Sequence, residues 1–109
     1  MDFKESYFKK VDLLPLLRDM KRIIIDVYGR VQGVFFRATT RKKARKWGLS
    51  GYVKNMSDGS VHIEAEGPQE KLENLLEFAH KGPSFANVKN VESSYEEASN
   101  EFNGFNVRY

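Results

Sequence analysis

The chain of 109 residues has the length of one ordinary domain, and a composition with 40% hydrophobic and 13% aromatic residues provides for a single modest core. It contains no cysteine, which excludes disulfides, thiolate nucleophiles and the usual structural zinc sites, and its two histidines are too few and too far apart to indicate a metal site. The net charge of +3 favours anionic partners, without deciding between small phosphate compounds and nucleic acids.

The sequence carries no membrane or secretion signal. No apolar run is long enough to cross a bilayer, and the first ten residues lack the basic stretch followed by an apolar stretch that marks a signal peptide. Together with the missing cysteines, this predicts a cytoplasmic protein that is held by packing alone.

The N-terminal residues 1–19 stand apart from the rest. Apolar side chains recur from Val11 to Met20, but Pro15 interrupts any helix there. We expect a loosely ordered, flexible extension, which leaves residues 20–109 as the domain. The alternative is a short helix that covers a sheet edge or binds a second copy. The sequence therefore predicts a monomer and leaves open a dimer through residues 1–19.

The first half of the domain predicts a strand followed by a helix. Alternating β-branched residues indicate a strand over residues 21–28, and the glycine-bounded stretch 29–33 follows it. A helical pattern then runs over residues 34–47, and Gly48 is placed to end it.

The second half predicts the remaining elements. The Asp58-Gly59 turn separates two strands, and a helix starts with Pro68 in its first turn and stops at Gly82. The expected strands are 51–55, 60–66, 88–95 and a short fifth at 105–109. The order β-α-β-β-α-β is that of an α+β, ferredoxin-like sandwich, with two helices on one face of an antiparallel sheet. This fold hosts many functions, so it does not decide among them.

The stretch VYGRVQGVFFR, residues 27–37, has the features of an anion site. Glycines at 29 and 33 let the backbone turn and present N–H groups inward, and the helix start adds unpaired N–H groups. Arg37 falls in the first helical turn, where its guanidinium can hold two oxygens of one phosphate. The two glycines taken alone indicate only a tight turn.

Asn55 ends the second predicted strand, next to the hairpin. In an antiparallel sheet this strand can lie near the first one, which brings the Asn55 amide toward the mouth of the anion site. An amide can hold a water molecule and aim it at phosphorus. Asparagine also shapes turns, and the spacing alone does not separate the two roles.

These stretches carry a family resemblance. VYGRVQGVFFR resembles the first acylphosphatase signature, and GYVKNMSDGSVHIEAEG at 51–67 resembles the second. The closing FNVRY is similar to the end of several family members, so the resemblance covers residues 20–109 and leaves residues 1–19 outside.

The resemblance implies the ferredoxin-like fold, hydrolysis of the carboxyl–phosphate bond of small acyl phosphates, and no cofactor or metal. It implies that Arg37 binds phosphate, that Asn55 positions the attacking water, and that the carboxylate of Tyr109 holds Arg37. The residues expected to bind the phosphoryl group together with Arg37 are Arg30, Val31, Gln32, Gly33, Val34 and Phe35.

Two alternatives remain at this stage. Residues 37–46 hold six basic side chains, which is compatible with an anion- or RNA-binding module, but an RNP pattern of sheet aromatics is absent and a solvated helix face is the favoured interpretation. The other is a carbamoyl-phosphate-handling domain of a larger maturation protein, which the end of the chain at Tyr109 argues against.

Overall fold

The computed structural model describes residues 20–109, so the predictions for residues 1–19 lie outside the described part. The elements follow the predicted order. They are β1 (Met20–Arg30), α2 (Phe36–Lys46), β2 (Ser50–Asn55), β3 (Val61–Pro68), α3 (Gln69–Lys81), β4 (Asn87–Glu97) and β5 (Phe105–Arg108).

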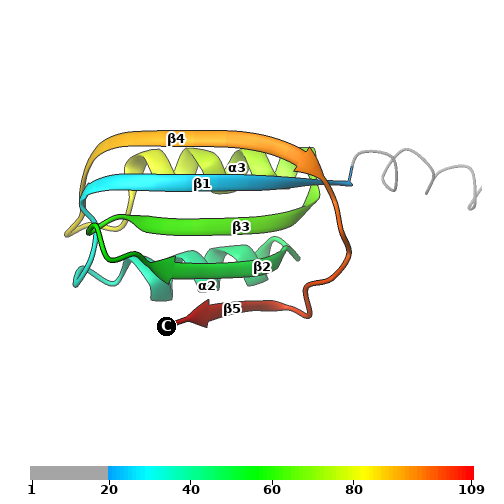
Figure 1. Cartoon of the computed structure of the whole chain (residues 1–109), viewed down its shortest axis with the longest axis horizontal. Coiled ribbons are helices and arrows are strands. Elements are labelled where there is room, and N and C mark those ends of the chain that lie inside the picture. The colour runs from blue at the N-terminus through cyan, green and yellow to red at the C-terminus, as the bar shows by residue number, and fades with distance from the viewer. Residues whose placement is uncertain (1–19) are drawn as a thin grey trace, which may run out of the picture.

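The five strands form one twisted sheet in the order β4-β1-β3-β2-β5, with both helices on the same face (Figure 1). The predicted ferredoxin-like α+β fold is confirmed. The expectation of an all-antiparallel sheet is wrong at one edge, where β5 pairs parallel with β2 while every other pair is antiparallel. The chain reaches this edge after β4 on the opposite side, and it crosses the end of the sheet on the way (Figure 1).

The core lies between the helices and the sheet. Inward-facing residues of β1 and β3 are fully buried, such as Ile23, Ile25 and Ile63. Alternation of β-branched residues places them on one face, because successive side chains of a strand point to opposite faces. Helix α2 contributes Phe36 and helix α3 contributes Leu72 among the buried residues. Within residues 20–109, no helix is long and apolar enough to cross a bilayer.

Strand β1 is longer than its apolar pattern predicts, because Gly29 and Arg30 still pair with β4 after a bulge. The φ angle of Gly29 is +124°, and a Cβ there would collide with the carbonyl oxygen of Asn87. Gly29 is therefore required by the close approach of β4, and not by a turn of the loop predicted to bind an anion. The loop begins one residue beyond the strand, at Val31.

Two helix starts also differ from expectation. Helix α2 begins at Phe36 and not at residue 34, because Phe35 has a left-handed φ of 66° that no right-handed helix accommodates. Pro68 is the last residue of β3, paired with Met20, and its extended ψ of 140° places it just before α3. A proline φ suits both conformations, so the residue type alone does not decide between them.

The sheet face opposite the helices carries a network of polar residues centred on Arg22. Its Nε atom lies 3.1 Å from the carboxylate of Glu66, which is 2% exposed, and its Nη2 atom donates to Glu101. Glu66 also accepts hydrogen bonds from the backbone and hydroxyl of Ser99 and from the backbone of Asn100. Burial opposes ionisation, but these donors and Arg22 outweigh it, so the pKa of Glu66 is lowered.

The network continues to His62, whose ring nitrogens lie 2.7 Å from Asp26 and 2.8 Å from Glu64. Ionised carboxylates only accept hydrogen bonds, so both bonds form together when the ring is protonated and both nitrogens donate. Burial alone would lower the pKa of His62, but the bonds to Glu64 and Asp26 outweigh it and raise that pKa. Tyr52 donates to Glu64 at 2.6 Å, and burial, followed by this bond, raises the pKa of Tyr52 to about 12. Arg108 of β5 lies over the Tyr52 ring at 3.9 Å.

Candidate active site

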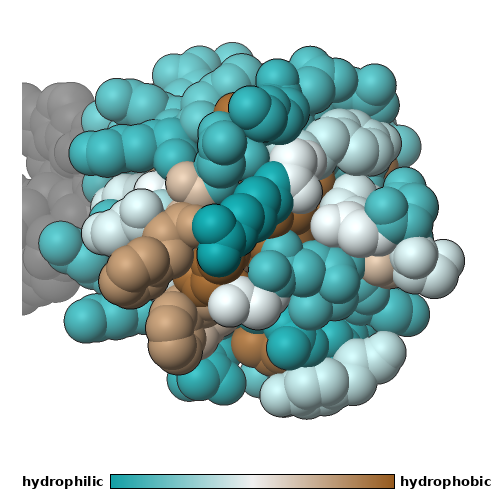
Figure 2. Space-filling model, turned by 90° about the vertical axis from the view of Figure 1, so that its left-hand side faces the viewer, coloured by the Kyte–Doolittle hydropathy of each residue, from teal (hydrophilic) through white to brown (hydrophobic). Residues whose placement is uncertain are grey.

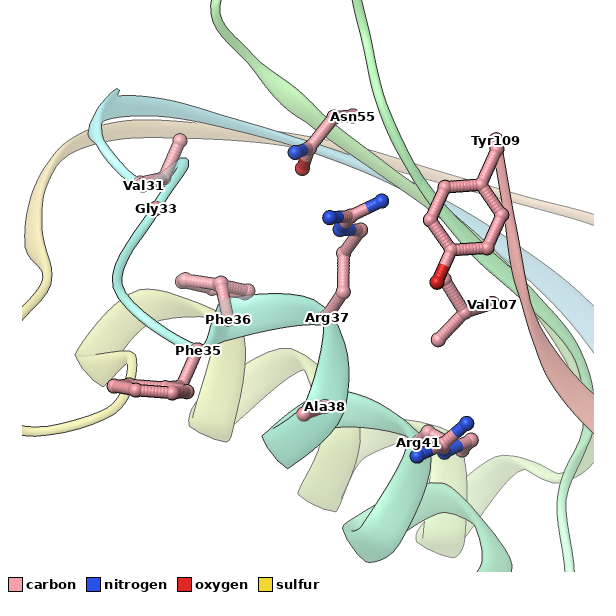
Figure 3. A pocket seen from close by; sticks show the side chains of 10 residues that line it. All are labelled: Val31, Gly33, Phe35, Phe36, Arg37, Ala38, Arg41, Asn55, Val107 and Tyr109. Atoms are coloured by element: carbon pink, nitrogen blue, oxygen red, sulfur yellow. The ribbon is translucent and has the colours of Figure 1, made fainter.

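A pocket of about 310 Å³ lies at the end of the sheet where β1, β2 and β5 finish and α2 begins (Figure 3). That volume is at the lower end of the range for small-molecule sites. Its lining combines apolar side chains with two arginines and one amide, and consists of Val31, Gly33, Phe35, Phe36, Arg37, Ala38, Arg41, Asn55, Val107 and Tyr109. Figure 2 views the molecule from this end and shows apolar surface near the centre, framed by hydrophilic residues.

The loop from β1 to α2, residues 31–35, forms one wall. Within residues 20–109, none of its five amides donates a hydrogen bond to a protein acceptor. Unpaired main-chain N–H groups at a helix start are donors for an anion. Gly33 and Phe35 both have left-handed backbones, with φ values of 74° and 66°. A left-handed backbone costs a non-glycine residue about 1–2 kcal/mol, so the loop conformation at Phe35 is strained.

Gln32 ties this loop to the β2–β3 hairpin. Its side-chain Nε2 atom donates to the carbonyl oxygens of Met56 and Ser60, each at 2.8 Å. Its side chain therefore holds the loop in place rather than lining the pocket. This bridging role of Gln32 was not predicted, because its acceptors are main-chain atoms that no sequence pattern identifies.

Arg37 is the second residue of α2, and it is half-buried with its guanidinium directed toward Asn55 (Figure 3). The guanidinium carbon lies 4.9 Å from the centre of the Tyr109 ring. The Tyr109 carboxylate was expected to hold Arg37, whereas the contact between the two residues is a cation–π contact with the ring. Within residues 20–109, Arg37 forms no ion pair, so its charge is available to a ligand.

Asn55 is the last residue of β2 and faces Arg37 across the pocket (Figure 3). Its side-chain oxygen is buried and has no hydrogen-bond partner within residues 20–109. Strand β2 was expected to lie near β1. The structure instead places β3 between the two strands. Asn55 still reaches the site, because both strands are antiparallel to β3 and therefore end at the same edge of the sheet.

The structure brings only part of the expected site to the pocket surface. Val31, Gly33 and Phe35 line it together with Arg37 and Asn55. The other expected residues lie apart from the lining: Arg30 pairs with β4, Gln32 binds the hairpin, and Val34 is buried in the core. The lining also includes Arg41, which the sequence analysis assigned to a solvated helix face although its spacing of four residues from Arg37 places both on one side of α2.

Known proteins match almost the whole described chain. The acylphosphatase family model matches residues 23–107. An acylphosphatase from Salinibacter ruber is 49% identical over 88 residues, which is 81% of this chain and 93% of that protein.

Solved structures match in the same way. An acylphosphatase from Coxiella burnetii superposes with a TM-score of 0.79 at 38% identity, over 87% of this chain and 99% of that one. Full-length HypF in a phosphate- and nucleotide-bound form matches with a TM-score of 0.76 at 27% identity, over 83% of this chain but 12% of that one. The family signatures, the fold and these relatives agree, and the chain belongs to the acylphosphatase family.

Proposed function

We propose that the pocket binds the phosphoryl group of a small acyl phosphate through the amides of residues 31–35 and Arg37, and that Asn55 positions the attacking water. Hydrolysis of acyl phosphates is the activity of the family to which the chain belongs. The products are a carboxylate and inorganic phosphate. The roles of the individual residues are the proposal.

The chemistry needs few groups, because the leaving group is a carboxylate that departs as a stable anion. The water oxygen attacks phosphorus while the bond between phosphorus and the acyl oxygen breaks and its electron pair leaves with the carboxylate. The water proton passes to a phosphoryl oxygen of the substrate. What the protein supplies is alignment of the reactants and stabilisation of negative charge on the phosphoryl oxygens. Loop amides and Arg37 provide the stabilisation, and Asn55 provides the alignment.

One observation carries the proposal, namely the buried side-chain oxygen of Asn55 that has no partner within residues 20–109 and faces Arg37. A buried acceptor without a partner costs about 1–3 kcal/mol, so a water molecule or substrate donor there is favoured. A guanidinium on the other side of the same pocket binds the phosphate that such a water would attack. Asn55 is thus suited to hold the nucleophile and Arg37 to hold the electrophile.

The test compares benzoyl phosphate with p-nitrophenyl phosphate, and wild type with Asn55→Ala. We expect rapid cleavage of the anhydride and negligible cleavage of the ester. Asn55→Ala loses most of kcat and keeps its affinity for inorganic phosphate, because it removes the water ligand and leaves the loop amides and Arg37. Asn90→Ala, an exposed asparagine of β4, is the matched control and keeps wild-type kcat. Wild-type turnover by Asn55→Ala would contradict the water-positioning role.

The alternatives from the sequence are not favoured. The acylphosphatase from Salinibacter ruber is matched over 93% of its length at 49% identity, whereas full-length HypF is matched over 12% of its chain at 27% identity. RNA binding without hydrolysis of benzoyl phosphate would reverse this preference. Family membership implies a small-molecule substrate. The monomeric state stays a prediction, which light scattering on the purified chain tests. The cytoplasmic location also stays a prediction, which cell fractionation tests.

A further inference from the structure

Three arginines form a row along α2, spaced four residues apart at Arg37, Arg41 and Arg45. The outer two contact β5 or the residue after it: Arg45 Nε donates to the carbonyl of Phe105 at 2.9 Å, and Arg37 lies over the Tyr109 ring. The middle one, Arg41, has neither a hydrogen bond nor an ion pair within residues 20–109. It is half-buried and lines the pocket. Of the three guanidinium groups, that of Arg41 therefore makes no stabilising polar contact within residues 20–109.

The pocket extends beyond the part that a phosphoryl group needs. Figure 3 shows Arg41 one helical turn after Arg37, with Ala38 on the same helix and Val107 of β5 on the other side. Residues four apart on a helix have Cβ atoms about 5–6 Å apart. A substrate whose phosphoryl group lies at Arg37 and Asn55 can therefore place its acyl arm along α2, so that the far end of a short arm comes near Arg41.

The two arginines of this part of the pocket have no ion-pair partner within residues 20–109. Arg37 and Arg41 both line it, and none of the ten lining side chains is acidic. Like charges at this helical spacing repel each other. A ligand with two anionic groups relieves the repulsion at both positions, whereas a phosphoryl group alone relieves it at one. Ala38, which also lines the pocket, adds only a small apolar side chain to this wall.

We propose that Arg41 is a specificity-determining residue, which binds a second anionic group on the acyl arm of the substrate. The preferred substrates are then acyl phosphates whose acyl part carries a carboxylate or phosphate. This inference rests on the proposed function, since it assumes that the phosphoryl group lies at Arg37. It concerns binding of the acyl arm and leaves the bond-breaking step unchanged.

The test uses two substrates that differ by one charged group. Benzoyl phosphate has a neutral acyl arm, and 4-carboxybenzoyl phosphate adds a rigid carboxylate that cannot attack its own acyl carbon. The measured quantity is the ratio of kcat/KM for the carboxylated substrate to that for benzoyl phosphate. Because both values come from the same preparation, the ratio does not depend on the folded fraction of a variant.

We expect Arg41→Gln to lower this ratio about three- to tenfold, mainly through KM, since one charge-assisted contact is lost. Arg41→Lys retains part of the ratio, because it keeps the charge and loses the planar fork. The matched control is Lys42→Gln, which removes one charge from the adjacent, exposed position of α2 outside the pocket lining. This control leaves the ratio within about twofold of wild type.

The outcomes separate the two proposals. A ratio unchanged by Arg41→Gln, or lowered equally by Lys42→Gln, overturns the role of Arg41 while benzoyl phosphate hydrolysis still supports the proposed function. A wild-type protein that cleaves neither substrate overturns the proposed function and this inference with it. A selective loss in Arg41→Gln, partly restored by Arg41→Lys, supports the inference.

Discussion

The pocket and the sheet face opposite the helices, called the open face below, differ in how their polar groups are paired. On the open face, Glu66 is almost fully buried and accepts three hydrogen bonds in addition to its ion pair with Arg22. In the pocket, the side-chain oxygen of Asn55 and the amides of residues 31–35 have no partner within residues 20–109. On the open face even Arg22 Nε, which makes no hydrogen bond within residues 20–109, lies 3.1 Å from the Glu66 carboxylate. The unpaired groups of the pocket have no such counter-charge beside them and are available to a ligand.

The difference has an energetic reason. A buried polar group without a partner destabilises the folded chain by about 1–3 kcal/mol, and the rest of the fold must offset this cost. Under the proposed function, the substrate supplies the missing partners in the pocket, so the cost is recovered on binding. On the open face, no ligand is needed, because Arg22, Ser99 and Asn100 already surround Glu66. Variants of the pocket should therefore change activity, and variants of the open face should change stability.

The largest effect is expected at Arg37. Under the proposed function, Arg37→Ala removes the charge that stabilises the phosphoryl oxygens, and we expect it to lower kcat/KM for benzoyl phosphate by about 10²–10³, or about 2.7–4 kcal/mol. The same substitution lowers the free energy of unfolding by less than about 1 kcal/mol, because the contact that it removes is only a half-exposed cation–π contact with Tyr109. Steady-state kinetics and urea unfolding measure the two quantities. Lys42→Ala, on the same helix, serves as the control. Equal losses of stability and activity would break the comparison.

The next effect is expected at Glu66. Glu66→Gln keeps the shape but places an uncharged amide among four donors, and we expect a loss of about 2–3 kcal/mol in the free energy of unfolding. The turnover of the folded protein is unchanged, because Glu66 does not line the pocket. Glu101→Gln is the matched control: Glu101 also binds Arg22, but it is 63% exposed and should cost less than about 1 kcal/mol. Similar losses in both variants would contradict the importance of burial.

The smallest effect is a pH dependence at His62. Because its folded pKa is raised, its contribution to stability is fully present below about pH 6.5, the ordinary histidine value, and is lost as the pH rises through the folded pKa. Glu64 and Glu66 act in the opposite direction: their pKa values are lowered, so they contribute above the ordinary glutamate value, and this is lost as the pH falls through the lowered values.

Urea unfolding across neutral and alkaline pH tests this assignment. His62→Gln should flatten the alkaline decline of stability by less than about 1 kcal/mol. It should weaken the decline at acidic pH without abolishing it, because Glu64 loses its bond to His62 whereas the partners of Glu66 are unchanged. His80→Gln is the control, because His80 is exposed at the end of α3. Parallel curves for wild type and His62→Gln would show that the imidazolium between Asp26 and Glu64 contributes nothing.

Some parts of the site were predictable because they are local in the chain. The β1 strand, the loop at 31–35 and Arg37 at the helix start all lie within one run of residues, so alternation, glycine and helix signals suffice to locate them. Local patterns left the boundaries less certain: the left-handed Phe35 delays α2, and the pairing of Gly29 with β4 lengthens β1. A residue's backbone angles there are set by the elements that pack against it, which the local pattern does not contain.

Periodicity and contiguous motifs were enough to predict the order of strands and helices, the apolar faces and the resemblance to one family. They did not predict that β3 separates β1 from β2, that β5 pairs parallel with β2, or which arginine of α2 has no partner within residues 20–109. Asn55, Arg41 and Tyr109 come from three elements far apart in the chain. Their meeting depends on strand order, and strand order is selected by burial of the whole sheet against both helices rather than by any local preference.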